Sequence, residues 1–254
     1  MRLKKTIVIA VLLVLVVIIV GIFVVRNIWS DSSQNSFFIW QDGYLAAAQD
    51  EQVDVAFTFL SNDPSLDTKV VSMGVPDNEN VEITNFNVEK MDQQYEDYEF
   101  YSIVLTLQFT STGKSTMNQL SMNLADGLPV TYSIGDWTLD IGDADDGKIW
   151  TWESPAVSSN SEEFAFSYTA QDASVTSCDL TVGTQTSVEL TADDEQTFSG
   201  KIELMESDAP VKYIRSKLTY CINGKTVYGY GKGCYCGALE FDEKGIIASR
   251  NHFI

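Results

Sequence analysis

The chain has 254 residues, of which 44% are hydrophobic and 20% are charged, a composition typical of folded globular proteins. It carries 36 acidic but only 16 basic residues, which gives a net charge of −20. Nucleic-acid binding needs clustered lysines and arginines that neutralise phosphates, so this charge balance argues against DNA and RNA as partners. The length allows one large domain or two small ones.

The N-terminus differs sharply from the rest of the chain. Three basic residues precede an unbroken apolar run from Ile7 to Val25, and Arg26 closes it. As a helix rising ~1.5 Å per residue, this run matches the ~30 Å hydrocarbon layer of a membrane. A cleavable signal peptide has a shorter apolar region that ends in small residues. We therefore expect an uncleaved membrane anchor, with cleavage between residues 30 and 33 as the alternative.

The basic residues also predict the orientation of this anchor. Three precede the apolar run and only one follows it, which places the N-terminus in the cytoplasm by the positive-inside rule. None of the acidic residues and four of the 16 basic residues lie before residue 27, so the remainder carries a net charge of −24. The sequence thus predicts a single-pass protein of the cell membrane with an extracytoplasmic C-terminal domain. The expected segments are a cytoplasmic tail (1–5), a transmembrane anchor (6–26) and a stalk (27–36).

Beyond residue 52 the apolar residues recur with a period of two, which is typical of half-buried strands. Residues 53–59 and 101–109 alternate throughout, and in residues 81–88 the alternation changes parity near Asn85, which indicates a β-bulge. The alanines in residues 43–51 indicate a short helix. Residues 37–40 either begin the first strand or belong to an aromatic belt at the membrane surface. Further strands are expected at 137–141, 150–152, 164–168, 178–182, 187–190 and 198–205.

The clearest hairpin covers residues 211–231, where Asn223 and Gly224 suit the positive φ angles of a type I′ turn. A two-residue loop at that point would place Tyr220 opposite Val227. Together these patterns predict an all-β fold of one or two antiparallel β-sandwiches. We favour two domains, residues 37–170 and a cysteine-containing domain of residues 171–254, with one large sandwich as the alternative.

Residues 81–124 read VEITNFNVEKMDQQYEDYEFYSIVLTLQFTSTGKSTMNQLSMNL. A strand, a polar loop, a long alternating strand, a turn and another strand follow in that order. The stretch resembles the immunoglobulin-like extracytoplasmic domains of Gram-positive lipoproteins and envelope proteins, although the chain lacks their lipid-acceptor cysteine near the N-terminus. The resemblance implies a binding or accessory module and supplies no catalytic residues.

The chain has four cysteines, an even number that is typical of disulfides on the oxidising side of a membrane. We expect two disulfides. Cys234 and Cys236 share one strand face with their Cβ atoms too far apart for good disulfide geometry, so each is expected to bond to Cys178 or Cys221. One bridge with two free thiols and a soft-metal site remain as alternatives.

Four aspartates crowd the predicted loop before residue 150, where their oxygens could bind calcium. They are Asp140, Asp143, Asp145 and Asp146. Their spacing is one residue short of the EF-hand pattern, and an ordinary solvated turn is the alternative. No other cofactor is expected.

Three tryptophans flank this acidic loop and could form a stacking surface for a ligand, with burial in the core as the alternative. They are Trp137, Trp150 and Trp152. The only histidine, His252, lies near the C-terminus, and no nucleophile elbow or glycine-rich phosphate loop occurs, so we expect no enzyme. The sequence predicts a membrane-anchored binding or accessory module of the cell envelope that contacts a protein partner. A carbohydrate-binding or carbohydrate-active ectodomain is the alternative.

Overall fold

The computed structural model describes residues 36–125, 127–143, 150–184, 186–237 and 243–252. The predicted cytoplasmic tail and membrane anchor, and the predicted stalk up to residue 35, lie outside the described residues. Within the described ranges, no helix is long and apolar enough to cross a membrane. Residues Phe37–Ile254 form a compact unit of their own.

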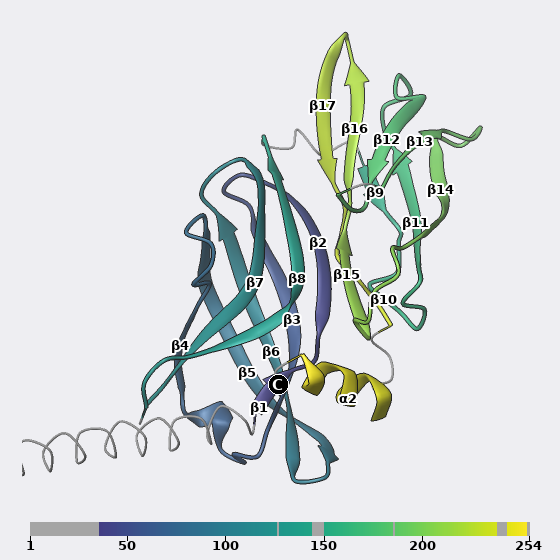
Figure 1. Cartoon of the computed structure of the whole chain (residues 1–254). Coiled ribbons are helices and arrows are strands. Elements are labelled where there is room, and N and C mark those ends of the chain that lie inside the picture. Colours follow the sequence, from purple (N-terminus) through teal and green to yellow (C-terminus); the bar gives the residue numbers. More distant parts are fainter. Residues whose placement is uncertain (1–35, 126, 144–149, 185, 238–242, 253–254) are drawn as a thin grey trace, which may run out of the picture. The chain divides into compact units, whose positions relative to one another are not determined.

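Four β-sheets make up most of this unit, so the predicted all-β class is confirmed (Figure 1). Sheet A has the order β1 (Ser36–Phe38), β3 (Gln52–Ser61), β6 (Tyr98–Phe109) and β5 (Val81–Tyr95). Sheet B has the order β10 (Val157–Ser158), β18 (Cys234–Cys236), β15 (Val211–Arg215), β2 (Gln41–Ala48), β8 (Val130–Gly142), β7 (Gly113–Leu124) and β4 (Val70–Gly74). Sheet C has the order β14 (Thr197–Glu203), β11 (Glu163–Ala170) and β9 (Trp150–Trp152). Sheet D has the order β13 (Ser187–Thr191), β12 (Ser177–Thr181), β16 (Lys217–Ile222) and β17 (Lys225–Tyr230).

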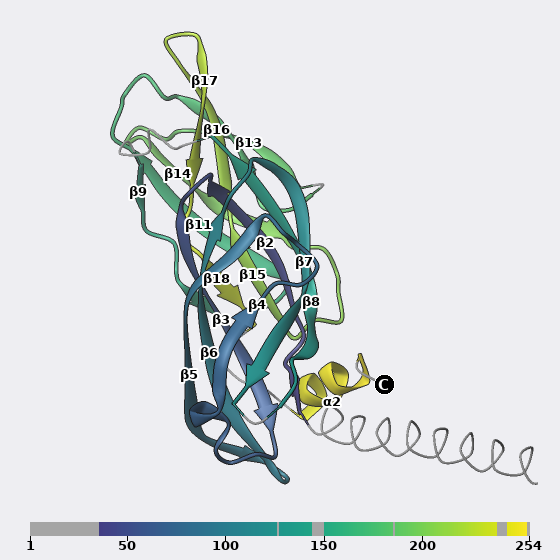
Figure 2. The same cartoon turned by 90° about the vertical axis from the view of Figure 1, so that its left-hand side faces the viewer.

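The strands with clear period-two alternation form where the sequence predicts them. In Figure 2, β5, β6 and β3 lie side by side, and both pairs are antiparallel. The buried and half-buried residues of β6 alternate, because one face of sheet A covers a core and the other faces solvent. The register of β5 against β6 shifts between Ile83 and Asn85, which confirms the predicted bulge.

Strand β2 lies where a short helix was predicted, and that prediction is wrong. Its alanines have high helix propensity, but they lie between two cores. Leu45 and Ala47 face the core between sheets A and B, whereas Ala46 and Ala48 face a second core. Strand β2 lies between β8 and β15 and pairs in parallel with both (Figure 1). Because a core covers each of its two faces, its sequence shows no alternation of apolar and polar residues.

The first core fills the space between sheets A and B, and the second lies between the other face of sheet B and sheets C and D. Strands β9 and β11 contribute Trp150 and Tyr168 to the second core, although they precede the predicted boundary between residues 170 and 171. Strand β15 follows that boundary, yet it pairs with β2 in sheet B. The two cores therefore do not divide at that point of the chain, because sheet B takes strands from both predicted domains.

The predicted hairpin is confirmed for β16 and β17, residues 217–230, whereas residues 211–215 form β15 and pair with β2 and β18 instead. Asn223 has a φ of 52° and Gly224 a φ of 76°, and Tyr220 pairs with Val227. Strand β16 continues the line of β15 after a break at Ser216, so one long hairpin arm starts in sheet B and ends in sheet D (Figure 1). A third, smaller core holds the C-terminal helix α2 (Glu243–Asn251), whose Ile246 packs near β1.

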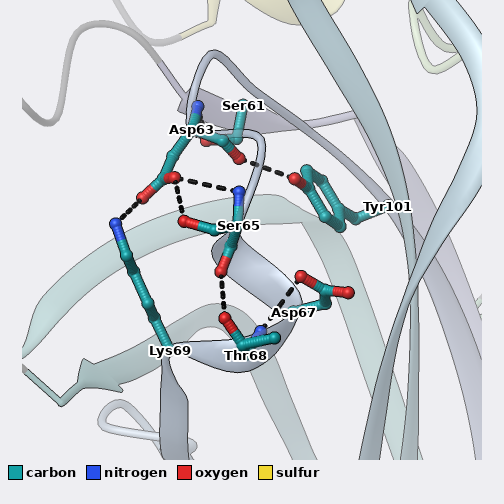
Figure 3. A network of polar contacts seen from close by, with 7 residues as sticks. All are labelled: Ser61, Asp63, Ser65, Asp67, Thr68, Lys69 and Tyr101. Carbon is teal, nitrogen blue, oxygen red and sulfur yellow. Dashed lines mark hydrogen bonds and ion pairs between the residues drawn. The ribbon is translucent and has the colours of Figure 1, made fainter.

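A polar loop follows β3 and contains a short 3₁₀ helix, η1 (Leu66–Thr68). Asp63 organises this loop, as Figure 3 shows. Its carboxylate accepts hydrogen bonds from the backbone N–H and the hydroxyl of Ser65 and pairs with Lys69, and its carbonyl accepts one from Tyr101 at 2.6 Å. Burial opposes ionisation of Asp63, but the hydrogen bonds from Lys69 and Ser65 outweigh it and lower its pKa.

Candidate functional site

A cavity of about 330 Å³ lies on the face of sheet B that looks toward the second core. Its floor comes from β2, β8 and β15, and its other walls come from residues next to β12, β13 and β14. Its volume falls at the lower end of the range of about 300 to 1,000 Å³ that is typical of small-molecule sites. The residues that line it are Asp42, Gly43, Tyr44, Asp136, Thr138, Val182, Gly183, Thr184, Thr186, Leu204, Met205, Glu206, Ser207, Lys212 and Ile214.

Two of its carboxylates come from neighbouring strands and are brought together by a bulge in β8. The register of β8 against β7 shifts between Ser133 and Trp137, and Gly135 has a φ of 129°, which favours glycine. The backbone N–H of Asp136, the next residue, donates a hydrogen bond of 3.0 Å to the Asp42 carboxylate. The bulge therefore places two acidic residues side by side at the cavity.

Among the described residues, Lys212 is the one basic residue that lines the cavity. It lies on β15 and is only 6% exposed. Its ammonium donates a hydrogen bond of 2.6 Å to the backbone carbonyl of Met205. Because Val211 and Tyr213 on either side of it pack in other cores, the alternation of β15 turns the Lys212 side chain toward the cavity.

The predicted calcium ligand Asp140 is buried in a network of its own beside the cavity. Its carboxylate accepts hydrogen bonds from Lys217 and from the Tyr44 hydroxyl, both at 3.0 Å, and Lys114 lies 3.7 Å away. Burial, and then the charge of Asp140, raise the pKa of Tyr44 well above its ordinary value. Asp140 thus pairs with Lys217 and Tyr44 in this structure, and its predicted role as a calcium ligand stays a prediction.

The remaining predicted calcium ligands are only partly described. Asp143 accepts a hydrogen bond from Tyr230 through its backbone carbonyl at 3.0 Å. Asp145 and Asp146 lie outside the described residues. Within the described ranges, no group of three or more histidine, cysteine or carboxylate side chains could hold a metal ion. A calcium site built on these aspartates stays a prediction.

The predicted stacking surface is not formed. Trp137 is 1% exposed and lies in the first core, stacked on Tyr213 with ring centroids 5.2 Å apart. Trp150 is buried in the second core, and Trp152 is half-buried against it. The prediction is therefore wrong for Trp137 and Trp150. Aromatic residues at alternate positions of a strand occur in buried cores as well as on ligand-binding surfaces, so their spacing does not distinguish the two.

The cysteines form no disulfide, so the prediction of two bridges is wrong. Tyr220 points into the second core, so the next residue, Cys221, points out of it and is exposed. The other three thiols are buried in that core, where burial raises the pKa of Cys178 to about 12. Cys234 and Cys236 lie with their sulfurs 3.8 Å apart, and this contact, together with burial, raises the pKa of Cys236.

None of the cavity's charged residues was predicted from the sequence. The signal for Lys212 was present, since it interrupts an otherwise apolar strand start in the segment VKYIR. A charged residue inside a strand with two buried faces is rare unless it is paired or functional. Asp42 and Asp136 carried no such signal, because the chain is rich in acidic residues.

Comparison with known proteins gives no family. No family model matches the chain, and no curated protein matches it. Solved structures that are similar to it include a chimeric titin Z1Z2-Z1Z2 tandem, with 11% identity over 78% of this chain and 98% of that chain and a TM-score of 0.21. The titin Ig tandem A164-A165 has 11% identity over 78% of this chain and 95% of that chain, with a TM-score of 0.23. The fibronectin(III)-like modules of CbhA from Clostridium thermocellum have 9% identity over 82% of this chain and 98% of that chain, with a TM-score of 0.22.

These solved structures include immunoglobulin modules, the class of domain that residues 81–124 resemble. TM-scores this low do not establish a shared topology. The all-β assignment therefore rests on the sheets themselves.

Proposed function

We propose that this chain is a binding module of the cell envelope that is anchored to the membrane by its N-terminal segment. The folded domain lies outside the cytoplasm and holds a cationic segment of a protein partner. The observation that carries this proposal is the acidic cavity on sheet B. Three of its lining residues are carboxylates and one is a lysine.

The charge of the whole molecule points the same way. A net charge of −20 attracts basic partners over distances of about a Debye length, ~8 to 10 Å at physiological salt. Within the cavity, the Asp42 and Asp136 carboxylates offer acceptors for an ammonium or guanidinium group. Complementary charge of this kind raises the association rate and selects against acidic partners.

A binding role fits the contents of the cavity better than a catalytic one. The single histidine of the chain stacks on Trp40 with ring centroids 4.0 Å apart and does not line the cavity. The carbohydrate alternative rested on exposed tryptophans, and the burial of Trp137 and Trp150 removes its main support.

The partner can be sought by photo-crosslinking in cells that express the full chain. A photoreactive amino acid replaces Thr186 at the cavity, and a matched variant carries it at Glu89, which is exposed on β5. We expect a discrete crosslinked envelope protein from position 186 and not from position 89. The crosslink should weaken in an Asp42→Asn, Asp136→Asn variant. Equal crosslinking from both positions, or none, would contradict the proposal.

The location has a separate test. Protease added to intact protoplasts should digest the folded domain, because the proposal places all of it outside the membrane. A domain that is protected until the membrane is opened would overturn the extracytoplasmic assignment, whatever the crosslinking shows.

A further inference from the structure

The cavity contains a buried lysine that forms no ion pair with any described residue. Lys212 is 6% exposed, and among the described residues its one hydrogen bond goes to the neutral carbonyl of Met205. None of the ion pairs of the described residues includes it. An ammonium has three N–H donors, so two are left for other acceptors.

The other cations of the same hairpin arm, buried Arg215 and half-buried Lys217, are paired. Arg215, three residues further on, donates to both carboxylate oxygens of Glu51, at 3.1 and 2.6 Å. Lys217 donates to Asp140 at 3.0 Å. Removing a charge from water costs several kcal/mol unless a partner or hydrogen bonds compensate, and a single carbonyl supplies one bond and no opposite charge. Lys212 is therefore the exception along this arm.

The acidic residues of the cavity do not form an ion pair with Lys212. Asp42 lies directly opposite Lys212 in the pairing of β2 with β15, and Asp136 and Glu206 line the same cavity. None of these three carboxylates forms an ion pair with the Lys212 ammonium. The cavity thus has a basic point on β15 and an acidic pair on β2 and β8. Because Lys212 and Asp42 are paired on neighbouring strands, the opposite charges lie side by side, and one small ligand that carries both charges would contact both.

We propose that the cavity binds a zwitterionic group, whose carboxylate accepts hydrogen bonds from Lys212 and whose cationic group lies against Asp42 and Asp136. This inference rests on the proposed function and adds the class of ligand. A volume of about 330 Å³ suits a single amino-acid residue better than a long chain. A basic amino acid with a free carboxylate has this chemistry, either as the free molecule or as the C-terminal residue of a peptide.

Isothermal titration of the full-length chain in detergent micelles tests the proposal. The probes are L-lysine, L-lysinamide, the peptide Ala-Ala-Lys with a free carboxylate, and acetyl-Lys-Lys-Lys-amide. We expect L-lysine or Ala-Ala-Lys to bind about tenfold or more tightly than L-lysinamide, because a hydrogen bond to a charged group contributes at least that much. Binding of free lysine identifies the amino acid as the source, and binding of the peptide alone identifies a C-terminus.

Two variants locate the carboxylate subsite. Lys212→Met keeps much of the side-chain length and removes the charge, and it should abolish the preference for a free carboxylate. Lys201→Met is the matched control, since Lys201 is 67% exposed in a surface ion pair with Glu163, and it should change nothing. The comparison of lysine with lysinamide uses the unaltered chain, so it stays decisive even where Lys212→Met fails to fold.

The results separate the inference from the function on which it rests. Equal affinity for L-lysine, Ala-Ala-Lys and L-lysinamide would overturn the carboxylate subsite while leaving a cation-binding cavity intact. Binding of acetyl-Lys-Lys-Lys-amide alone would do the same. Failure of all four probes to bind would overturn both proposals.

Discussion

Strands β6 and β2 are both central in their sheets, but they bury their side chains in different ways. From Tyr101 onward, strand β6 turns one face to the first core and its burial alternates, whereas Tyr98 and Phe100 at its start pack in the third core. Strand β2 is covered on both faces, and its last five residues are all buried. Its neighbour β15 is buried throughout. We call β2 and β15 the shared wall, because they supply residues to both main cores.

The two situations make different demands on the sequence. A strand with one covered face needs only apolar and polar residues in alternation. A strand between two cores needs small or apolar side chains on both faces and a partner for every charge. The shared wall meets this demand with three consecutive alanines on β2 and with the Arg215–Glu51 ion pair, and Lys212 on β15 is the exception. Mutations in the wall should therefore cost more than the same changes in one-faced strands.

The largest effect is expected at Glu51. Glu51→Ala leaves the Arg215 guanidinium, whose side chain is 9% exposed, without its carboxylate partner. Breaking a fully buried pair costs about 3 to 5 kcal/mol, but Glu51 is 33% exposed and Arg215 keeps a hydrogen bond to the Gly231 carbonyl. We therefore expect a loss of about 2 to 4 kcal/mol of unfolding free energy, measured by chemical denaturation of the full chain. Glu163→Ala is the control, because its partner Lys201 is 67% exposed, and it should cost less than about 1 kcal/mol. Equal losses would show that the shared wall holds no special charge pair.

A smaller effect is expected from enlarging an alanine of β2. Ala46 is fully buried against the second core, so Ala46→Leu should force neighbouring side chains apart and cost about 1 to 3 kcal/mol. Ala56 lies on the solvent-facing side of β3 and is half-buried, so Ala56→Leu should change the unfolding free energy by about 0.5 kcal/mol or less. Similar changes in unfolding free energy for the two variants would mean that one face of β2 is exposed to solvent.

The smallest effect concerns the loop after β3, outside the wall. The folded-state pKa of Asp63 is lowered, so its ionised form stabilises the fold above its unfolded value near 3.8, and this contribution is lost as pH falls through the folded pKa. Asp63→Asn should cost about 0.5 kcal/mol at pH 7, because the side chains of Lys69 and Asp63 are 33% and 30% exposed and solvent screens their ion pair. The difference should shrink as pH falls below 3.8 and disappear once pH is below the folded pKa, which lies lower. A difference that grows on acidification would contradict the assignment.

The contrast between the two kinds of strand also explains what the sequence could predict. The alternation of Tyr101, Ile103 and Leu105 marks β6 directly, and Asn223-Gly224 marks the hairpin. The alanines of β2 show no alternation, and their helix propensity points to the wrong element. Only the pairing with β8 and β15, which are far away in sequence, makes them a strand.

The cavity could not be predicted from the sequence, because its charged residues also come together only through strand pairing. Lys212, Asp42 and Asp136 come from three strands that the sequence does not connect, and a bulge at Gly135 sets the position of Asp136. The tryptophans and aspartates that we predicted as site residues lie close together in the sequence instead. Folding buries Trp137 and Trp150 and ties Asp140 to Lys217.

Calorimetric unfolding of the full chain tests most directly whether β2 and β15 belong to both cores. A wall shared by two cores cannot be lost from one without exposing the other, so we predict a single cooperative transition. Its calorimetric enthalpy should equal the van't Hoff enthalpy, and Ala46→Leu should move the whole transition to lower temperature. Two resolved transitions, of which Ala46→Leu shifts only one, would contradict the account.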